Sequence, residues 1–578
     1  PEDKAALSAE LELVEVGRGE ALVRQGDPAD ALYIVVSGRF VVTREGREAP
    51  ITEIAPDQPI GEIAFLTGCP RTATVRALRD SLVLKLGREQ FDRLSAGKPS
   101  IWRTLTATLA HRLAVTTAAE RRPPDARPRT IAVIHAGDRP VPPAFLHRLT
   151  SAFAARSRTL VVDSAQGLPG LDVDLGTPEA TRALNELERQ YQTIVFIADA
   201  ELTAWSEKVL RHADLLLAVG HFEAKSNPNT LERRAAGYLA PEAVRLVLLH
   251  PTRTQVKGTA RWLDGRNAAM HHHVALDEPA DVDRLLRFVN GTARGIVACG
   301  GGALCAAHVG LFKALVEAGI GFDIMGGTSA GSAMAAAFAL GTPPDDINRA
   351  VHDIFVRNRA MARYTWPRYS LLDHRHFDQH LARYIGQSDI EDLWIPFFAV
   401  STNLSRNSIH QHRRGDLWAA VRASSSIPAL LPPVYTADGE MLVDGCLLDN
   451  VPVGVMRALK SGPNVVVAFA LPQLERFNVD YAALPSRGEL MRRALQPIGR
   501  PDLPDAPGPA AVLMRSLMAN RQDFQRHMGP DDLLLVPPLP ADAGVLDWHR
   551  HDELMDAAFR WARGEIARRA DEGHPALT

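Results

Sequence analysis

The sequence has little cysteine, little net charge and no long apolar run. Its four cysteines in 578 residues give no disulfide framework, so a reducing compartment is expected. A formal net charge of −3 gives no support for bulk nucleic-acid binding, and no nucleic-acid partner is expected. Because no apolar run approaches the length of about 18 residues that a transmembrane helix needs, no membrane-spanning helix is expected.

The chain does have length and an ordinary balance of residue types. Hydrophobic residues make up 46% and charged residues 23%, which is usual for globular chains. The length predicts roughly three to five domains. Composition therefore predicts a multidomain globular protein, and its chemistry has to be sought in local motifs.

The most informative motif is the G-x-S-x-G stretch Gly327–Gly331. It follows the apolar segment 322–326 and leads into a run of small residues with high helix propensity, Ala330–Leu340. A G-x-S-x-G between a strand and a helix is the setting of a nucleophile elbow, in which the serine oxygen projects from a sharp turn. Ser329 is therefore a candidate nucleophile, with a helix N-terminus behind it.

A second glycine-rich turn lies upstream of the elbow. Gly295–Cys299 is predicted as a buried strand, and a helix is predicted over 306–318; the turn between them contains Gly300, Gly301 and Gly302. Such glycines leave backbone N–H groups bare and able to approach a ligand closely. The turn could bind phosphate, but neither G-x-x-x-x-G-K-[ST] nor a full G-x-G-x-x-G is present. An oxyanion hole for acyl transfer is the better interpretation.

A candidate general base ends a later strand. Asp444 follows the stretch 439–443 and precedes Gly445. An aspartate held at a strand end by a glycine turn can accept a proton from a serine. Ser329 and Asp444 therefore form a candidate nucleophile–base pair.

These short motifs occur together in one protein family. The residues concerned are Gly300–Ala303, Ala307–Gly310, Gly326–Gly331, Asp444 with Gly445, and Asn450–Val453. They resemble the patatin-like phospholipases, specifically the neuropathy target esterase branch. The resemblance implies an α/β hydrolase domain over residues 293–578 with a helical C-terminal extension. It also implies that Ser329 is the nucleophile, that Asp444 is the base with no histidine, and that the glycine turn forms the oxyanion hole.

The glycine turn departs from the family pattern. The family usually follows the glycines with a small residue, then Arg or Lys, then Gly, whereas this chain has Ala303, Leu304 and Cys305. A charge near the acyl site is thereby missing, and a side chain is added to the turn. Backbone donors can survive both changes. We interpret Cys299, Cys305 and Cys446 as small buried residues.

The N-terminal residues 1–122 are predicted to form a β-roll with C-terminal helices. Short apolar strands cut by glycine turns occupy residues 11–90, and apolar residues at helical spacing follow over 101–119. Such even spacing of strands and turns is typical of a compact barrel or roll. The later helix could be a dimer helix, which would make the protein a homo-oligomer.

A candidate phosphate-binding cassette lies inside this roll. A short helix starting near Gly61 would present N–H groups to a cyclic phosphate, Arg71 would supply a planar cation, and Glu62 would accept a hydrogen bond from a ribose hydroxyl. With Thr72, these residues resemble the cassette of cyclic-nucleotide-binding domains. The resemblance implies cAMP or cGMP as a regulatory ligand. The alternative is an empty loop held by an ion pair between Arg71 and Glu62.

A charged, proline-rich linker, residues 123–129, is predicted to precede an α/β domain over 130–290. Continuous apolar runs between helices predict a parallel sheet covered on both faces. The layout resembles P-loop ATPases of the ParA and MinD type, but the P-loop position holds His135–Pro140 without a lysine. We interpret the domain as a degenerate, Rossmann-like spacer, which also occurs in relatives of neuropathy target esterase.

Three adjacent histidines, His271–His273, invite interpretation as a metal site. They cannot all face one ion on a regular element, and no cysteine or carboxylate cluster lies nearby in the sequence. We therefore expect them at the surface of a loop or strand, and we expect no metal site in the chain.

The segment 354–369 mixes four arginines with aromatic and apolar residues. Arginine heads beside Trp and Tyr suit a lipid headgroup interface, whereas the alternative is a helix and loop packed on the core with the arginines in water. The stretch 421–428 resembles the family segment that shapes the acyl pocket. Both segments bear on how a lipid would reach Ser329.

The family resemblance implies a serine esterase that releases fatty acid from lysophospholipids or phospholipids without a catalytic cofactor. Regulation through the β-roll and a cytoplasmic protein peripheral on the inner face of a membrane are further expectations. The competing interpretation is a cyclic-nucleotide-sensing interaction protein with a weakened hydrolase site, as the changes at Leu304 and Cys305 would indicate.

Overall fold

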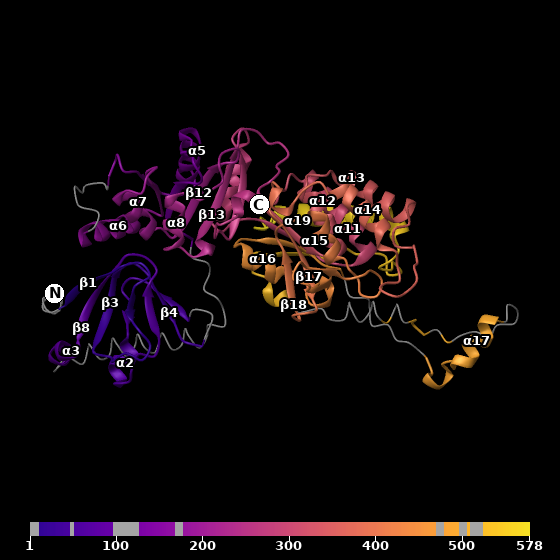
Figure 1. The fold of residues 1–578 in the computed structure, drawn as a ribbon, viewed down its shortest axis with the longest axis horizontal. Helices are drawn as coiled ribbons and strands as arrows, with labels where there is room; N and C mark the ends of the chain where they lie inside the picture. The colour runs from indigo at the N-terminus through magenta and orange to yellow at the C-terminus, as the bar shows by residue number, and fades with distance from the viewer. Residues whose placement is uncertain are drawn as a thin grey trace. The chain divides into compact units, whose positions relative to one another are not determined.

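The computed structural model describes residues 11–46, 51–95, 127–167, 177–469, 479–495, 504, 506–508, 512 and 524–577. The chain forms two compact units, Pro1–Gly291 and Thr292–Thr578 (Figure 1). The helix predicted over 101–119 and most of the predicted linker 123–129 lie outside the described residues.

The first part of the N-terminal unit is a β-roll made of two antiparallel four-stranded sheets, with strand orders β1-β8-β3-β6 and β2-β7-β4-β5. The apolar sides of the strands meet inside, where Val35, Phe40 and Val83 are fully buried. This confirms the predicted roll. The strands are β1 (Glu12–Val16), β2 (Ala21–Val23), β3 (Ala31–Ser37), β4 (Phe40–Thr43), β5 (Thr52–Ile54), β6 (Pro59–Ile60), β7 (Thr74–Ala77) and β8 (Ser81–Gly87), and the helices are α2 (Glu62–Thr67) and α3 (Arg88–Ser95).

The second part of this unit is a six-stranded, all-parallel sheet with the order β10-β11-β9-β12-β13-β14. Successive residues of β9 from Ile131 to Ile134 are all buried, so both faces of the sheet are covered, as predicted. The strands are β9 (Thr130–His135), β10 (Thr159–Val162), β11 (Thr193–Ile197), β12 (Leu215–His221), β13 (Val244–His250) and β14 (Met270–Ala275). The helices are α5 (Pro143–Ala154), α6 (Pro178–Gln190), α7 (Ala204–His212), α8 (Thr230–Ala236), α9 (Ala260–Leu263) and α10 (Pro279–Val289).

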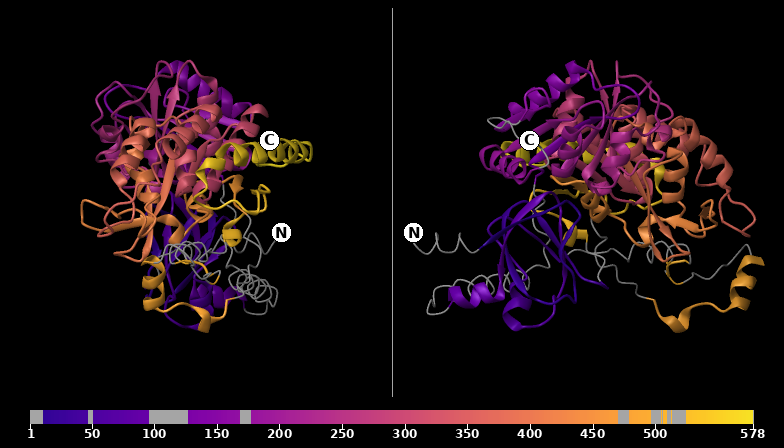
Figure 2. Two further views of the ribbon diagram at one scale, coloured as in Figure 1. Left: turned by 90° about the vertical axis from the view of Figure 1, so that its right-hand side faces the viewer. Right: turned by 60° about the vertical axis from the view of Figure 1, so that its left-hand side comes forward.

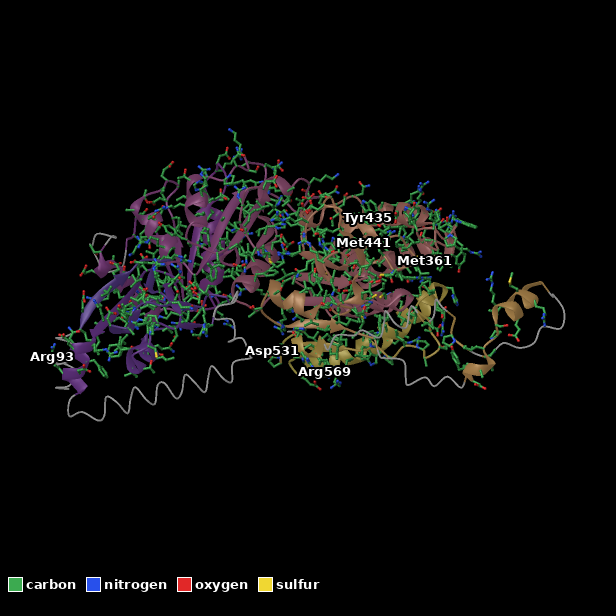
Figure 3. The ribbon with its side chains drawn as sticks, turned by 60° about the horizontal axis from the view of Figure 1, so that its bottom comes forward. Arg93, Met361, Tyr435, Met441, Asp531 and Arg569 are labelled. Carbon is green, nitrogen blue, oxygen red and sulfur yellow. The ribbon has the colours of Figure 1, made fainter. Side chains whose placement is uncertain are left out.

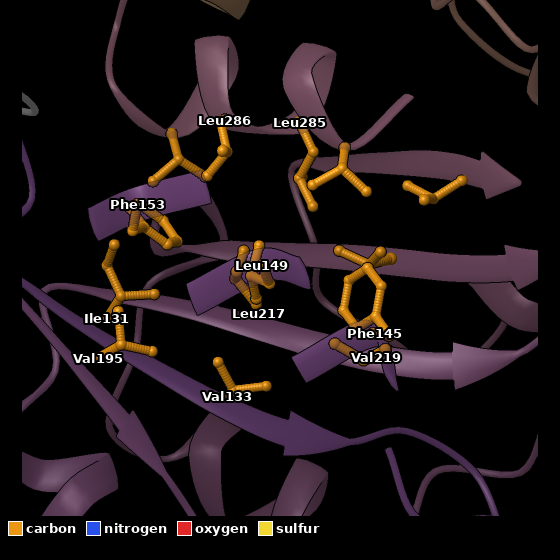
Figure 4. Close-up of a cluster of buried hydrophobic side chains, with 14 of the residues drawn as sticks. Ile131, Val133, Phe145, Leu149, Phe153, Val195, Leu217, Val219, Leu285 and Leu286 are labelled. Atoms are coloured by element: carbon orange, nitrogen blue, oxygen red, sulfur yellow. The ribbon is translucent and has the colours of Figure 1, made fainter. Parts of the chain in front are cut away.

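One face of this sheet is covered by α5 and α10. Figure 4 shows Phe145, Leu149 and Phe153 of α5 beside the strand residue Leu217 and the α10 residue Leu285. The helical spacing of these phenylalanines and leucines places them on one side of α5, which explains why the sequence folds onto the sheet there.

The expectation of exposed histidines at 271–273 is wrong for two of the three. His272 and His273 lie on β14 and are only 2% and 1% exposed. The His272 ring packs against Phe288 of α10, with 4.6 Å between ring centroids, and burial lowers the pKa of His272 well below its usual value. The residue type suggested a surface, but the helix that covers β14 could not be placed from the triplet itself.

At the P-loop position, the turn at Gly137 is hydrogen-bonded to a carboxylate of the same chain, that of Glu232. The Gly137 N–H donates to Glu232 Oε2 at 3.1 Å, and Arg266 holds the same carboxylate through its Nε at 2.5 Å and its Nη2 at 3.0 Å. Asn229 Nδ2 donates to the carbonyl oxygens on either side, those of His135 and Gly137. This closed turn supports the interpretation of the domain as a spacer without a phosphate cradle.

Buried charges join the β-roll to the parallel-sheet domain. Asp80, which is fully buried, pairs with Lys208 Nζ at 3.2 Å and with Arg211 Nη2 at 2.8 Å. Next to it, Arg79 Nη1 pairs with Glu188 Oε1 at 2.7 Å. Removing one partner of such a buried pair leaves an uncompensated charge, so these pairs strongly specify the contact.

The C-terminal unit is built on an eight-stranded mixed sheet with the order β19-β20-β17-β16-β15-β21-β22, and β18 also pairs with β17. The strands from β17 to β22 in this order are parallel, whereas β18, β19 and β20 run antiparallel to their neighbours. The strands are β15 (Gly295–Ala298), β16 (Ile324–Thr328), β17 (Phe397–Asn403), β18 (Ser408–His412), β19 (Val434–Tyr435), β20 (Met441–Asp444), β21 (Asn464–Val467) and β22 (Leu533–Leu535).

Helices α11 (Ala306–Glu317) and α19 (His551–Asp571) of the C-terminal unit pack closely against each other. The long helix α19, yellow in Figure 2, lies along α11. A Cβ on Gly310 would lie 2.1 Å from the Met555 carbonyl oxygen, so only glycine permits this approach. The helices are α11 (Ala306–Glu317), α12 (Ala330–Ala339), α13 (Pro344–Val351), α14 (His374–Ile385), α15 (Leu417–Ser424), α16 (Val453–Leu459), α17 (Arg487–Leu495) and α19 (His551–Asp571).

Within the described residues, no helix has both the length and the apolar character that crossing a membrane requires.

Candidate active site

Ser329 lies on a strained turn between β16 and α12, as the elbow motif predicts. Its backbone has φ 53° and ψ −136°, a positive φ that a residue with a side chain rarely adopts. The flanking glycines allow the turn to press on the end of β15. A Cβ on Gly327 would lie 2.6 Å from the Ala298 carbonyl oxygen, and one on Gly331 would lie 2.2 Å from that of Cys299.

The structure brings Ser329 and Asp444 together. Ser329 Oγ donates a hydrogen bond to Asp444 Oδ2 at 2.6 Å, and the Cys446 N–H donates to Asp444 Oδ1 at 3.0 Å. Asp444 is fully buried, and this burial raises its pKa to about 6, although both hydrogen bonds act in the opposite direction. A carboxylate with such a pKa is largely ionised at neutral pH and is close to the optimum for a general base.

The backbone N–H of Ser329 is held by a residue that the sequence analysis did not single out. It donates to Ser424 Oγ at 2.9 Å, and Ser424 Oγ donates in turn to the Val400 carbonyl oxygen at 2.5 Å. Ser424 is fully buried at the end of α15. It therefore links the strained elbow to the neighbouring strand β17. The stretch 421–428 had been singled out only for its likeness to an acyl-pocket segment, and nothing in its pattern indicates this contact.

The structure reduces the set of N–H groups that can form the predicted oxyanion hole. The Gly300 N–H donates to the Asn450 carbonyl oxygen at 3.2 Å, and Asn450 Nδ2 donates back to the Gly300 carbonyl oxygen at 3.3 Å. Because the Gly300 N–H already has a partner, the inclusion of Gly300 among the oxyanion donors is corrected. Among the described residues, no hydrogen-bond acceptor is assigned to the N–H groups of Gly301 and Gly302.

Close contacts explain why this turn needs glycine. Gly302 has φ +57°, and a Cβ there would lie 2.2 Å from the Val545 carbonyl oxygen. A Cβ on Gly301 would lie 2.8 Å from the Phe469 ring. Gly302 and Ser329 line the same pocket, so the unbonded N–H of Gly302 belongs to the surroundings of the serine.

The departure at Leu304 and Cys305 is accommodated without opening the turn. Cys305 is fully buried, and its thiol donates to the Cys299 carbonyl oxygen at 3.4 Å. The predicted burial of Cys299, Cys305 and Cys446 is confirmed. His308 Nδ1 donates to the Cys305 carbonyl oxygen at 3.1 Å, and burial lowers the pKa of His308 to about 4. This neutral imidazole supports the turn and does not contact the Ser329–Asp444 pair.

An apolar pocket leads away from Ser329. Its empty volume is about 1100 Å³, part of which is open to solvent. Helices α12, α13, α14 and α15 all contribute to its wall. The apolar lining residues include Ala333, Met334, Ala337, Ile347, Val351, Ile354, Phe355, Met361, Phe377, Leu381, Val421, Ile427, Leu431 and Trp548. A lining of this kind suits an aliphatic chain.

The structure also places Arg71 and Gly61 of the predicted nucleotide cassette in contact. Arg71 is 3% exposed and donates to the carbonyl oxygens of Gly61, at 3.1 Å, and Ala31, at 2.6 Å. Gly61 has φ +81°, and a Cβ there would lie 2.0 Å from Arg71 Nη1. Glu62 is buried at the start of α2, whereas Thr72 is exposed.

The described residues contain no group of three or more His, Cys, Asp or Glu side chains able to hold a metal ion.

Comparison with known families divides the chain in the same places. Residues 13–97 match the family described as Cyclic nucleotide-binding domain, and residues 128–295 match the Neuropathy Target Esterase family P-loop like domain. Residues 296–457 match the family described as Patatin-like phospholipase. These three segments make the chain similar to proteins of the neuropathy target esterase family. The three segments follow one another in the order that the motifs predict.

Similar curated proteins extend beyond this chain. A patatin-like phospholipase domain-containing protein of Caenorhabditis elegans is 30% identical over 96% of this chain and 46% of its own length. Lysophospholipase NTE1 of Coccidioides immitis is 27% identical over 97% of this chain and 41% of its own length. Neuropathy target esterase sws of Drosophila melanogaster is 29% identical over 78% of this chain and 35% of its own length. The chain thus spans less than half the length of these relatives.

Proposed function

We propose that the C-terminal unit is a serine esterase that releases fatty acid from lysophospholipids or phospholipids, with Ser329 as nucleophile and Asp444 as general base. The observation that carries this proposal is the 2.6 Å hydrogen bond from Ser329 Oγ to the buried Asp444 carboxylate. The patatin match and the names of the relatives, among them a lysophospholipase, support the lipid class of the substrate.

The proposed mechanism uses one base, Asp444, in both acylation and deacylation. Asp444 accepts the proton of Ser329 as the serine oxygen attacks the ester carbonyl carbon. The N–H groups of Gly301 and Gly302 then donate to the tetrahedral oxyanion. Asp444 returns the proton to the leaving alcohol, which leaves a fatty acyl ester on Ser329. In the second half, Asp444 takes a proton from water as the water oxygen attacks the acyl carbon. It gives that proton to the Ser329 oxygen as the acyl–oxygen bond breaks, which frees the fatty acid and restores the serine.

The apolar pocket supports a long-chain substrate. It starts at Ser329 and Gly302 and continues between helices lined by aliphatic and aromatic side chains. An acyl chain in this pocket would place the ester carbonyl between the serine oxygen and the glycine turn. The head group would then lie toward solvent, which fits a phospholipid or lysophospholipid better than a small soluble ester.

The test is fatty-acid release from lysophosphatidylcholine by the wild type, Ser329→Ala and a control, Ser408→Ala, which changes an exposed serine on β18. Ser329→Ala is expected to lower turnover on the order of 10⁴-fold or more, because it removes the nucleophile of a coupled pair. Ser408→Ala should retain wild-type turnover. Equal turnover by Ser329→Ala and the wild type, both correctly folded, would contradict the proposal.

We further propose that the β-roll binds cAMP or cGMP and that this ligand regulates the esterase. Arg71 supports this, because its buried Nε–H has no hydrogen-bond partner among the described residues, and an arriving phosphate oxygen would satisfy it. Turnover with and without each nucleotide should differ in the wild type and not in Arg71→Ala. Unchanged nucleotide dependence in a folded Arg71→Ala protein would contradict regulation through this cassette.

We also propose that the protein works at a membrane surface, peripherally on the inner face, because its proposed substrates are bilayer lipids.

A further inference from the structure

A short hairpin projects from the C-terminal unit between the π-helical turn His352–Arg357 and helix α14. Tyr364 and Leu372 form an antiparallel bridge, and the Thr365 N–H donates to the Leu371 carbonyl oxygen at 2.9 Å. Below them, the Asp373 N–H donates to the Arg363 carbonyl oxygen at 2.8 Å. These bonds give residues 363–373 a defined backbone, so the hairpin presents its side chains in a fixed arrangement.

The base of this hairpin belongs to the rim of the apolar pocket. Met361, labelled in Figure 3, lines the pocket two residues before the hairpin begins. On the other side, the N–H groups of Leu371 and Leu372 donate to the carbonyl oxygens of Ala429 and Leu430. That segment lies between Ile427 and Leu431, two further pocket residues. Anything that binds the hairpin is therefore held beside residues that line the pocket of the candidate active site.

The tip of the hairpin exposes large aromatic side chains. Tyr364 is 81% exposed, Trp366 86% and Tyr369 76%. Every residue from Ala362 to Tyr369 is exposed, so these rings have no core to pack against. Trp and Tyr have an apolar body and a polar tip, and they are enriched where one end contacts lipid and the other contacts water.

Arginine is the charged residue of the segment that includes these rings, and aspartates stand only at its two ends, Asp353 and Asp373. The stretch 354–372 contains four arginines and no aspartate or glutamate. Arg363 and Arg368 are exposed within the hairpin, and the Arg368 guanidinium lies 5.3 Å from the centre of the Tyr369 ring. Cationic side chains interleaved with Trp and Tyr complement the anionic headgroups and the interfacial zone of a bilayer.

We propose that residues 363–369 dock the esterase on an anionic phospholipid surface and thereby hold the pocket entrance against the source of its substrate. This inference rests on the proposed lipid esterase function. Trp366 and Tyr369 enter the interface, and Arg363 and Arg368 pair with lipid phosphates. The hairpin takes no part in the chemical step, so it acts on access to lipid and not on turnover of a dissolved ester.

Vesicle binding tests the docking surface without catalysis. The full chain carrying Ser329→Ala is sedimented with vesicles of phosphatidylcholine alone, or of equal parts phosphatidylcholine and phosphatidylglycerol. Adding Trp366→Ala and Tyr369→Ala should lower the affinity for the mixed vesicles roughly tenfold or more, because two rings no longer leave water. Arg363→Glu with Arg368→Glu should remove the preference for mixed vesicles and its sensitivity to salt. The matched control is Tyr481→Ala, which changes an aromatic side chain that is 87% exposed elsewhere in the unit.

A second measurement uses the same hairpin changes with Ser329 intact. They should slow hydrolysis of lysophospholipid held in anionic vesicles, while hydrolysis of a dissolved short-chain ester stays at the wild-type rate. Undiminished vesicle binding by both hairpin variants would overturn the proposal, as would an equal loss of binding in Tyr481→Ala. A wild type that binds mixed vesicles through the hairpin yet hydrolyses neither substrate would instead contradict the proposed esterase and leave the docking surface supported.

Discussion

Two glycine turns in this molecule follow strands of similar kind but differ in whether their backbone N–H groups are hydrogen-bonded. Each follows a strand inside a parallel region of a sheet, Gly137 after β9 and Gly300–Gly302 after β15. At Gly137 the N–H donates to the buried Glu232 carboxylate, which Arg266 holds in place. At Gly301 and Gly302, within the described residues, the N–H groups have no acceptor, and Gly302 lines the same pocket as Ser329.

This difference in hydrogen bonding shows that glycine residues alone do not make a turn into an anion-binding site. A turn becomes a site when its N–H groups stay unpaired and face a cavity, and it becomes structural when the chain supplies its own anion. The first glycine of the catalytic turn makes the same point on a smaller scale, because the Gly300 N–H is bonded to Asn450. This contrast is tested by closing the open turn, by titrating the base, by loosening the elbow and by removing the internal anion.

Outside the Ser329–Asp444 pair, the largest effect is expected from closing the open turn. Gly301→Ala adds a Cβ that would lie 2.8 Å from the Phe469 ring, so the turn must shift and its donors lose alignment. We expect kcat to fall about 10²- to 10³-fold, as for the loss of an oxyanion donor, with a smaller change in KM. Steady-state hydrolysis of lysophosphatidylcholine measures both constants.

The matched control places the same change in the closed turn. Gly137→Ala puts a Cβ 2.4 Å from the Lys225 carbonyl oxygen at φ +74°, so it should destabilise the N-terminal unit. Turnover per folded molecule should be unchanged. If Gly137→Ala lowered kcat as strongly as Gly301→Ala, the functional contrast between the two turns would be wrong.

A second effect follows from the pKa of Asp444. Burial raises this pKa to about 6, and the base must be ionised to accept the serine proton. Activity should therefore rise with pH, level off above about 6, and fall about tenfold for each pH unit below that value. The measurement is kcat/KM across this pH range.

Asp449 provides the control for this pH profile, because burial also raises its pKa to about 6. If Asp444 is the base, Asp449→Asn should retain the acid limb of the profile. An acid limb that disappears in Asp449→Asn would assign the titration to the wrong aspartate.

A smaller effect is expected from loosening the elbow. Ser424→Ala leaves the Ser329 N–H without its acceptor, so the strained turn is less firmly held. We expect kcat to fall roughly tenfold, at the lower end of the cost of an unsatisfied buried donor, while KM stays nearly constant. The rate of covalent labelling by a fluorophosphonate should fall by the same factor. A rise in KM with unchanged kcat would assign Ser424 to substrate binding and not to the positioning of Ser329.

The smallest effect on activity is expected from removing the internal anion. Glu232→Gln leaves Arg266 with a buried, unpaired charge, which should lower the free energy of unfolding by about 3 kcal/mol. Turnover by the folded protein should match that of the wild type, because this turn carries no chemistry. Chemical denaturation followed by activity measurement separates the two quantities, and reduced turnover at full folding would contradict the contrast.

The local pattern of the sequence was enough to predict much of this architecture. The elbow at Ser329, the glycine turn, the β-roll and the covered parallel sheet all follow from strands, helices and turns that are close in sequence. The closeness of Ser329 to Asp444 came from the family resemblance, and the structure provides its geometry.

Contacts between segments far apart in the chain could not be predicted from the sequence. The bond from the Ser329 N–H to Ser424 and the bond from the Gly300 N–H to Asn450 join residues far apart in the chain. Neither Ser424 nor the loss of Gly300 as a donor has a local signal. The burial of His272 likewise depends on where α10 packs, which the polarity of the residue does not disclose.

The most direct test of the central claim is to react the purified chain with a fluorophosphonate and to map the adduct by mass spectrometry. The account predicts one adduct per molecule on Ser329, none on Ser329→Ala, and strongly slowed labelling of Asp444→Asn, because the nucleophile would lack its base. An unlabelled Ser329 in folded wild-type protein, or labelling as fast in Asp444→Asn as in the wild type, would contradict the claim that these two residues form an esterase pair.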